Sequence, residues 1–560
     1  MSSKALKNKD TFWGEIFADI SGYISDKWYM IATVLTTIGS YGFWITHYSI
    51  SADDLNGESM YSGALFAQGR MTATIFNMIT QLGNNKVFFR DLIGTLCMFA
   101  AAILFCIVFD RAFKTSNRAA QTVFSCIFLS YPLHMELFRW TGTSVSIGLG
   151  CVLACLSALA IMDFFDSKKL TRILFAVFCL FWVSSWYESV LILYVATVFA
   201  ILLLEQIKKG PYKFSELIIR GLYFAVPLIV AFVLEFVVST GVRELLGLEV
   251  SDSAANGINW ELSSPSAMAV RFVQMIKHYI WFFTVKGMWY LPLQVLIVAM
   301  VILFVSFFVI SRKKKQKLSI FLCILALIFT VFSMSLLQGG AILHRTSQAF
   351  SFVTAFAAYI LIMLCSPKEK NGKRMGYRIV CTVISFVIFL QASEMNRWFT
   401  LDHYRFEEES RVAEEIGYTL EQNYDLSMPV VFVGEYELSD YLKKQIYLDR
   451  ESNRLIRFMD SIPVFHKYYD ELTVDEEGRL INVYQQTGCT VFMNGASYYD
   501  GITSGILLKF FKYCGYDNFL PATQEQYDDG YKLAESMPCW PEKGSIVQTD
   551  EYILVKIGNQ

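Results

Sequence analysis

Long apolar runs alternate with polar segments along the chain, and this pattern predicts a helical membrane protein. A bilayer core about 30 Å thick takes about 20 mainly apolar residues per helix, because hydrocarbon does not tolerate unpaired backbone groups. Runs of this kind lie near residues 27–48, 91–110, 119–137, 143–163, 173–187, 189–204, 215–239, 289–311, 318–338, 346–365 and 378–394. We therefore expect about eleven transmembrane helices.

Basic residues mark alternate connections between these runs. They cluster in Arg111–Arg118, Lys168–Arg172, Lys208–Lys213, Arg312–Lys317 and Lys368–Arg374. Positive charge favours the cytoplasmic side of a membrane, so these five connections and the lysine-containing N-terminus are predicted to be inside. The N-terminus lacks a small-residue cleavage site, so it is interpreted as retained. The chain after about residue 395 is then outside.

The stretch 173–204 tests this scheme, because basic residues flank it at both ends. Two short helices that turn at Ser185–Glu188 satisfy the charge pattern and place Glu188 at the outer face. A single long buried or re-entrant helix is the competing interpretation.

Polar composition separates the tail from the apolar part and predicts two domains, 1–395 in the membrane and 396–560 outside it. In the tail, Glu407–Glu421 has a helical pattern, whereas 429–434 and 552–557 are typical of buried strands. A small α/β domain follows. Two long outer loops, 49–90 and 239–288, are also expected, and each ends in an amphipathic stretch that suits the membrane interface.

Composition agrees with this division. The chain is 54% hydrophobic and only 18% charged, which excludes a purely soluble protein. The net charge of −2 gives no indication of a nucleic-acid partner. Only Cys489, Cys514 and Cys539 lie in the polar tail, an odd number without CxxC spacing, so neither a disulfide framework nor a zinc site is predicted.

Two adjacent carboxylates, Asp53 and Asp54, follow the first apolar run directly and are predicted to be outside. Neighbouring carboxylates resist joint ionisation, which raises one pKa and suits proton abstraction from a substrate. Solvated acidic residues on an outer loop are the alternative interpretation.

Basic residues on the outer face are the candidates for binding an anion. Gly69–Arg70 begins an interfacial stretch, and its guanidinium could hold a lipid phosphate or simply reach the headgroups. His344 and Arg345 lie in a very short outer connection, where positive charge runs against the orientation bias. An anionic lipid phosphate would explain them, and Lys286 is a weaker candidate of the same kind.

Two glutamates complete the candidates. Glu188 interrupts an apolar run of more than thirty residues, and ionisable groups at such positions are usually functional. Glu136 lies at the outer end of the third run, where it could pair with Arg139 or contact substrate. The chain contains no Walker-type loop, HExxH or GxSxG motif, and no basic stretch outside the cytoplasmic connections that would indicate nucleic acid.

At this point the pattern resembles the bacterial membrane glucosyltransferases related to phage O-antigen glucosyl transferases, which have the glycosyltransferase C fold. Nearly the whole chain takes part in the resemblance. The segments that carry it are Asp53–Asp54, Gly69–Arg70, Tyr131–Pro132 with Glu136, Trp186–Ser189, His344–Thr346, Pro429–Gly434 and Trp540–Ser545.

The resemblance implies a transferase of the bacterial plasma membrane that moves a sugar, glucose or a similar hexose, from a polyprenyl-phosphate carrier to a cell-surface glycan. By this likeness Asp53 or Asp54 is the general base, and Arg345 with Arg70 holds the donor phosphate. Glu136, Glu188 and His344 are further expected substrate contacts, although family members more often carry Gln at the position of Glu188. No metal or other cofactor is expected, since arginine can stabilise the leaving phosphate.

A lipid or oligosaccharide transporter is the main alternative function. It would need ionisable residues near the middle of the bilayer and usually shows repeated halves. The charges here gather at helix ends and no repeat is visible. A receptor or assembly protein whose tail binds a partner is less favoured, because it has little need for ionisable groups at many outer helix ends.

Overall fold

The computed structural model describes residues 11–47, 49–50, 55, 64–80, 87–138, 144–249, 264–281, 291–312, 317–339, 348–366, 374–434, 436, 439, 442, 461, 463 and 505–558. The described residues form two compact units. Unit 1 holds nearly all helices up to Asn396. Unit 2 holds the tail from Arg397 and, from the front of the chain, the described residues within 47–58.

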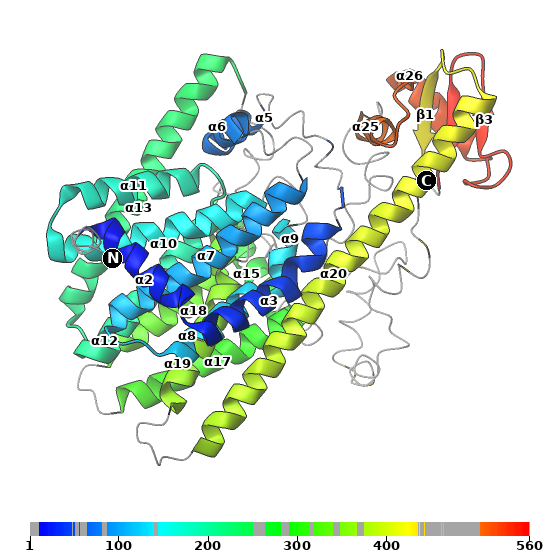
Figure 1. Ribbon diagram of the computed structural model, residues 1–560. Coiled ribbons are helices and arrows are strands. Elements are labelled where there is room, and N and C mark those ends of the chain that lie inside the picture. Colours follow the sequence, from blue (N-terminus) through cyan, green and yellow to red (C-terminus); the bar gives the residue numbers. More distant parts are fainter. Residues whose placement is uncertain are drawn as a thin grey trace, which may run out of the picture. The chain divides into compact units, whose positions relative to one another are not determined.

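Unit 1 consists of helices, and every predicted apolar run coincides with one of them (Figure 1). These are α3 (Lys27–Thr46), α7 (Val87–Phe113), α8 (Arg118–Leu129), α10 (Ser144–Ser167), α11 (Leu170–Ser184), α12 (Ser189–Lys209), α13 (Phe214–Leu246), α17 (Leu291–Ser311), α18 (Leu318–Gln338), α19 (Gln348–Cys365) and the first half of α20 (Arg374–Asn423). Shorter elements are α2 (Phe12–Ile24), α5 (Ala64–Ala67), α6 (Met71–Thr80), a 3₁₀ turn (Pro132–His134), α9 (Met135–Phe138) and α15 (Pro265–Trp281).

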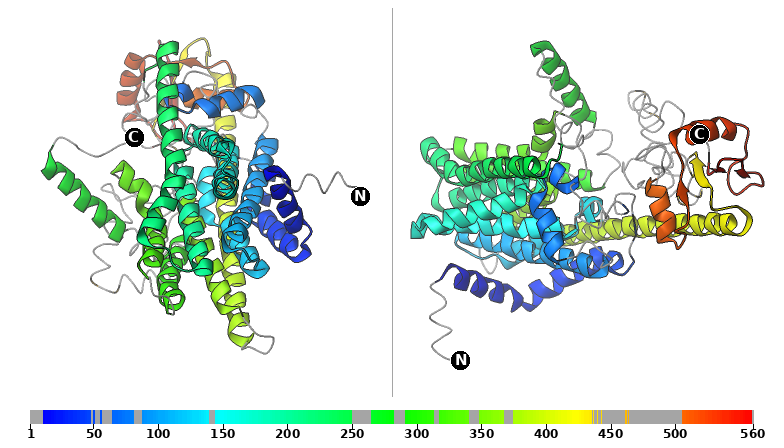
Figure 2. Two further views of the ribbon diagram at one scale, coloured as in Figure 1. Left: turned by 90° about the vertical axis from the view of Figure 1, so that its left-hand side faces the viewer. Right: turned by 90° about the horizontal axis from the view of Figure 1, so that it is seen from above.

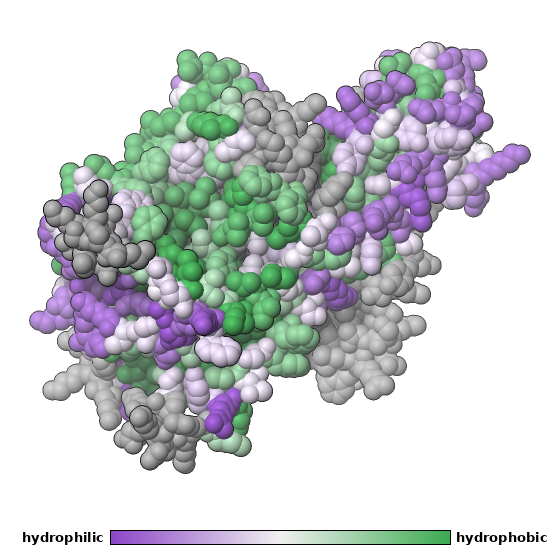
Figure 3. Space-filling view, viewed as in Figure 1, coloured by the Kyte–Doolittle hydropathy of each residue, from purple (hydrophilic) through white to green (hydrophobic). Residues whose placement is uncertain are grey.

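Length and hydropathy mark the chain as a membrane protein. Among the described residues, eight helices are long and apolar enough to cross a bilayer, while α8 and α11 are apolar but shorter. Leu222, Val226, Phe232 and Phe236 on α13 are exposed, as residues that face lipid would be. Figure 3 shows hydrophobic side chains over the middle of unit 1, a hydrophilic patch on another part of it, and mostly hydrophilic side chains over unit 2. The count of eleven crossings remains a prediction.

Glycine allows α7 and α10 to pack with their backbones in contact. A Cβ on Gly148 would lie 2.6 Å from the carbonyl oxygen of Gly94, and a Cβ on Gly94 would lie 2.8 Å from the backbone of Ser144. Small residues of this kind let membrane helices approach closely. The two helices run in the same direction beside α12, as the two figures of the fold show (Figures 1 and 2).

Two helix boundaries differ from the sequence prediction. The third run was expected to form one helix over 119–137, but α8 ends at Leu129 because Tyr131, which precedes Pro132, is extended. The last span was expected to end at 394, but α20 continues for 50 residues and absorbs the separate helix predicted at Glu407–Glu421. No Gly or Pro interrupts 377–416, so the backbone meets no signal to stop.

The turn between α11 and α12 agrees with the prediction. The α11 helix ends at Ser184 and α12 begins at Ser189, with the chain turning at 185–188. The segment 173–204 is therefore two helices rather than one long one.

Unit 2 is a four-stranded sheet between helices. The strand order is β2 (Leu520–Pro521), β1 (Pro429–Val433), β4 (Ile553–Lys556) and β3 (Ile546–Gln548). The strands expected at 429–434 and 552–557 are β1 and β4, which pair in parallel. One face packs on the end of α20 and α25 (Gly505–Tyr513), and the other on α26 (Gln524–Ala534). Alternate residues of each strand point to the two faces, so both are apolar.

Candidate functional site

Arg70 lies against the turn between α11 and α12. Its guanidinium carbon is 5.3 Å from the centre of the Tyr187 ring. The start of α6 is held to the same turn, because the Thr72 N–H donates to Ser185 Oγ at 3.1 Å. Phe76 also packs against Trp186, with ring centres 4.9 Å apart and ring planes inclined by 56°. The structure thus brings the Gly69–Arg70 and Trp186–Ser189 segments together, although more than one hundred residues separate them.

The α13 helix adds further charges to this place. A Cβ on Gly69 would lie 3.2 Å from Ser239 Oγ and 3.7 Å from Glu235 Oε1, so the two segments nearly touch. Glu235 is within electrostatic range of Glu188 and of Arg243. We call Arg70, Tyr187, Glu188, Glu235 and Arg243 the Arg70 cluster. Two guanidinium groups and two carboxylates in one cluster can bind both an anion and hydroxyl groups.

Sequence reasoning missed Glu235. The signal was present, because Glu235 is a carboxylate within an apolar run, the criterion that singled out Glu188. Glu188 itself is exposed, at the residue before the first turn of α12.

Gly69→Ala is expected to lower turnover roughly tenfold, because the backbone that places Arg70 would shift. Gly69 has a φ of +78°, where an added Cβ is strained, and the nearby Ser239 hydroxyl leaves little room. Turnover and thermal unfolding of the purified protein measure the effect.

Gly247→Ala is the matched control for Gly69→Ala. Its φ is +64°, but a Cβ there would meet nothing within 4 Å. Both variants should lose some stability, and only Gly69→Ala should lose turnover. An equal loss of turnover in the two variants would contradict the role assigned to Gly69.

Arg90 is a second cation in the first turns of α7, and it is buried, with 4% of its surface exposed. Its Nε is 3.7 Å from Asp91 Oδ1, and Ser144, the first residue of α10, donates to the same oxygen at 3.0 Å. Within the part of the chain that the structure describes, Nε and Nη2 of Arg90 have no hydrogen-bond partner. These two groups form one edge of the guanidinium, which matches two oxygens of a phosphate.

A buried guanidinium with two unsatisfied donors is unfavourable by several kcal/mol unless a ligand or water completes it. The first turns of α7 and α10 lie side by side at Arg90, and helix N-termini favour anions. Arg90 and the two helix N-termini favour an anion there, while the buried carboxylate of Asp91 beside them offsets part of that positive charge. No sequence pattern indicated this, since Arg90 marked only the end of an expected loop.

The structure describes one further predicted site residue. Glu136 is buried on α9, which packs against α10. Asp53, Asp54, His344 and Arg345 lie outside the described residues, as do Arg139 and Lys286. No group of three or more His, Cys, Asp or Glu side chains among the described residues could hold a metal ion.

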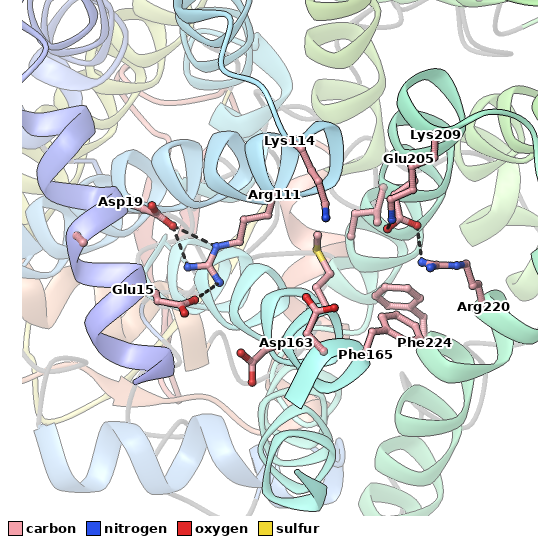
Figure 4. A pocket seen from close by; sticks show the side chains of 14 residues that line it. Glu15, Asp19, Arg111, Lys114, Asp163, Phe165, Glu205, Lys209, Arg220 and Phe224 are labelled. Carbon is pink, nitrogen blue, oxygen red and sulfur yellow. Dashed lines mark hydrogen bonds and ion pairs between the residues drawn. The ribbon is translucent and has the colours of Figure 1, made fainter. Parts of the chain in front are cut away.

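A charged pocket of about 550 Å³ lies at the other end of the same helices. Figure 4 shows Arg111 beside Asp19 and Glu15, and Arg220 beside Glu205. Arg111 donates to Asp19 at 2.8 Å, and Arg220 donates to Glu205 at 2.6 Å. These pairs join α2 to α7 and α12 to α13. The pocket is explained by ion pairs between helix ends, and it is far along the helices from Arg70 and Arg90.

Comparison with known families decides the class of the protein. The family model described as Glucosyl transferase GtrII matches residues 42–362, more than half of the chain. The chain belongs to the GtrII glucosyl transferase family. The resemblance noted in the sequence is thereby confirmed, and the protein is a glucosyltransferase with membrane character. No curated protein matches the chain.

The GtrII match extends over the Arg70 cluster, Arg90, the predicted pair Asp53–Asp54 and the His344–Arg345 segment. It ends before α20, so the sheet of unit 2 lies outside it. By contrast, Ser49, Ile50 and Leu55, which belong to unit 2, lie within the matched range.

Proposed function

We propose that this GtrII protein transfers a hexose, glucose or a close relative, from a polyprenyl-phosphate carrier to a cell-envelope glycan on the outer side of the plasma membrane. Family membership supports glucosyl transfer, while the carrier, the acceptor and the side are the proposal. The observation that carries a phosphate-linked donor is the buried guanidinium of Arg90, with its two unsatisfied donors between two helix N-termini.

The reaction needs a base, an attacking hydroxyl and a stabilised leaving group. Asp53 or Asp54 takes the proton of the acceptor hydroxyl while the acceptor oxygen bonds to C1 of the sugar. The bond between C1 and the phosphate oxygen breaks, and its electron pair remains on the polyprenyl phosphate. Arginine side chains stabilise the negative charge that the leaving phosphate gains. Arg90 is assigned this role together with Arg70 and Arg345.

The other candidate residues are assigned to the sugar and the acceptor. Glu188, Glu235 and Glu136 can accept hydrogen bonds from sugar hydroxyl groups, and His344 can donate one. Residues 1–395 are assigned as the catalytic membrane domain, and 396–560 as an extracytoplasmic domain. With eleven crossings and a cytoplasmic N-terminus, Arg70, Arg90 and Glu188 are on the outer side.

Purified protein is expected to transfer glucose from polyprenyl-phosphate glucose and to show no transfer from UDP-glucose. The reason is that the assigned arginines hold one lipid-linked phosphate, and no residue is assigned to a nucleotide base or to a second phosphate. Incorporation of radiolabelled glucose into a glycan acceptor measures the reaction. The Asp53→Asn/Asp54→Asn double variant is the negative control. Transfer from UDP-glucose alone would refute the proposed donor.

Intact cells treated with a membrane-impermeant maleimide are expected to label Cys539 in the tail. Cys514 should react slowly, because burial, reinforced by Glu414 and Glu409, raises the pKa of its thiol to about 12. Little reactive thiolate is then present at neutral pH. Mass spectrometry of tail peptides measures the label.

Cys539→Ser is the control for this labelling and should abolish the Cys539 adduct. An adduct that forms only after cell lysis would place the tail inside and overturn the topology.

A further inference from the structure

Unit 2 holds the chain on both sides of Asp53–Asp54. Ile50 is buried in the core that α20 and α25 form with the sheet, together with Phe406. Leu55 packs against the same core. The described residues before and after the predicted catalytic pair therefore pack in the hydrophobic core of the tail, although 355 residues separate Ile50 from Arg405 on α20.

A buried ionic network fixes the segment before the pair. Arg405 on α20 has no exposed surface, and its Nη2 donates to the carbonyl oxygen of Ile50 at 3.1 Å. Its Nε donates to Asp402 at 3.2 Å and its Nη1 to Glu409 at 2.5 Å. Asp402 also accepts a hydrogen bond from Ser49 Oγ. We call these five residues the Arg405 clamp.

The spacing of the clamp follows from helix geometry. Asp402, Arg405 and Glu409 are three and four residues apart, so all three project from one face of α20. One turn further along, the same face continues as Val412, Ala413 and Ile416, which are buried and apolar. Apolar packing therefore holds this part of the helix to unit 2. Among the described residues, Glu408 also accepts hydrogen bonds from Tyr436 and Ser439, and the Arg405 clamp lies where Ser49 and Ile50 arrive.

Stability alone does not explain such a network. Removing ions from water is unfavourable by several kcal/mol for each, and a buried ion pair is often no more stable than apolar residues of the same volume. Hydrogen bonds differ from apolar contacts in having direction, so they fix the orientation of a backbone carbonyl and a hydroxyl. The clamp therefore specifies where one short stretch of chain lies.

We propose that Arg405 is a positioning residue that holds the Asp53–Asp54 segment in its working place, and that this is a function of unit 2. The inference rests on the proposed function, in which one of these aspartates is the base. Arg405 itself touches neither substrate nor reacting atoms. Part of the catalytic geometry of this chain is then supplied from outside the range that matches the GtrII family.

The experiment compares full-length Ser49→Ala and Arg405→Lys protein with Arg411→Lys, an exposed arginine on the same helix. Hydrogen exchange of the peptide covering residues 47–58 measures how firmly the segment is held. Steady-state kinetics with polyprenyl-phosphate glucose separate kcat from the KM of the donor.

Ser49→Ala is expected to speed exchange in this peptide and to lower kcat by roughly 3- to 10-fold, as loss of one hydrogen bond allows. A lysine at position 405 cannot donate to Asp402, Glu409 and the Ile50 carbonyl oxygen from one planar group. Arg405→Lys is therefore expected to lower kcat by roughly 10- to 100-fold. The KM of the donor should stay within about twofold in both, because the phosphate contacts are elsewhere. Arg411→Lys should match the parent protein.

Three results are distinguishable. Faster exchange together with the kcat loss supports the proposal, and Ser49→Ala provides the result if Arg405→Lys does not fold. Unchanged exchange in both variants overturns the clamp and leaves the transferase proposal intact. Faster exchange with normal kcat overturns the positioning role, and the assignment of Asp53 or Asp54 as the base is then decided separately by their Asn variants.

Discussion

Replacing Asp53 or Asp54 by Asn is expected to reduce turnover by roughly 10²-fold or more, the usual contribution of a positioned general base. The two variants should differ, since adjacent residues point in different directions and only one can face the acceptor. Asp53 is favoured as the base because it is nearer the helix that anchors the segment. Transfer of radiolabelled glucose to the glycan measures the loss.

Asp550→Asn, at an exposed carboxylate of the tail, is the control for a general effect of lost negative charge. Expression and thermal unfolding should be unchanged in all three proteins. Full transferase activity in both Asp53→Asn and Asp54→Asn would refute the assignment of this segment as the catalytic centre.

Arg90→Gln is expected to weaken donor binding by roughly 10- to 100-fold, the contribution of charged hydrogen bonds to a phosphate. The kcat should fall as well, because the phosphate gains charge as it leaves. Binding of polyprenyl phosphate to purified protein, measured without acceptor, separates the anion contact from catalysis.

A second variant removes the ambiguity of a buried charge. Arg90→Gln leaves Asp91 buried without its cationic neighbour, which is destabilising. Arg90→Gln/Asp91→Asn removes both charges and should recover stability without recovering donor binding. If the double variant binds polyprenyl phosphate as tightly as the parent protein, Arg90 does not contact the donor.

Most helices of unit 1 could be predicted because the signal is local. Twenty apolar residues must form a helix in hydrocarbon, so the run itself determines the element. The turn at 185–188 was predictable for a similar reason, since basic residues at both ends of 173–204 favoured two short helices over one long helix. The two boundary errors came from local signals that had not been weighed, namely Pro132 after Tyr131 and the absence of Gly or Pro over 377–416.

The site was less predictable, because its residues are distant in sequence. Arg70 and Glu188 could be selected singly as charges in unusual places, but nothing in either segment indicates that they meet or that Glu235 joins them. Arg90 gave no sequence signal, since an arginine before an apolar run is typical of a helix end. Only packing shows that it is buried with unsatisfied donors.

The glycine contact between α7 and α10 has a consequence for ligand affinity. Backbones that touch at Gly94 and Gly148 leave no room for sliding, so the spacing between Arg90 and Ser144 is set before any ligand arrives. A phosphate that binds there meets a preorganised receptor and loses little free energy to rearranging it. Enlarging Gly94 to Ala should therefore weaken anion affinity even though the new methyl group touches no ligand.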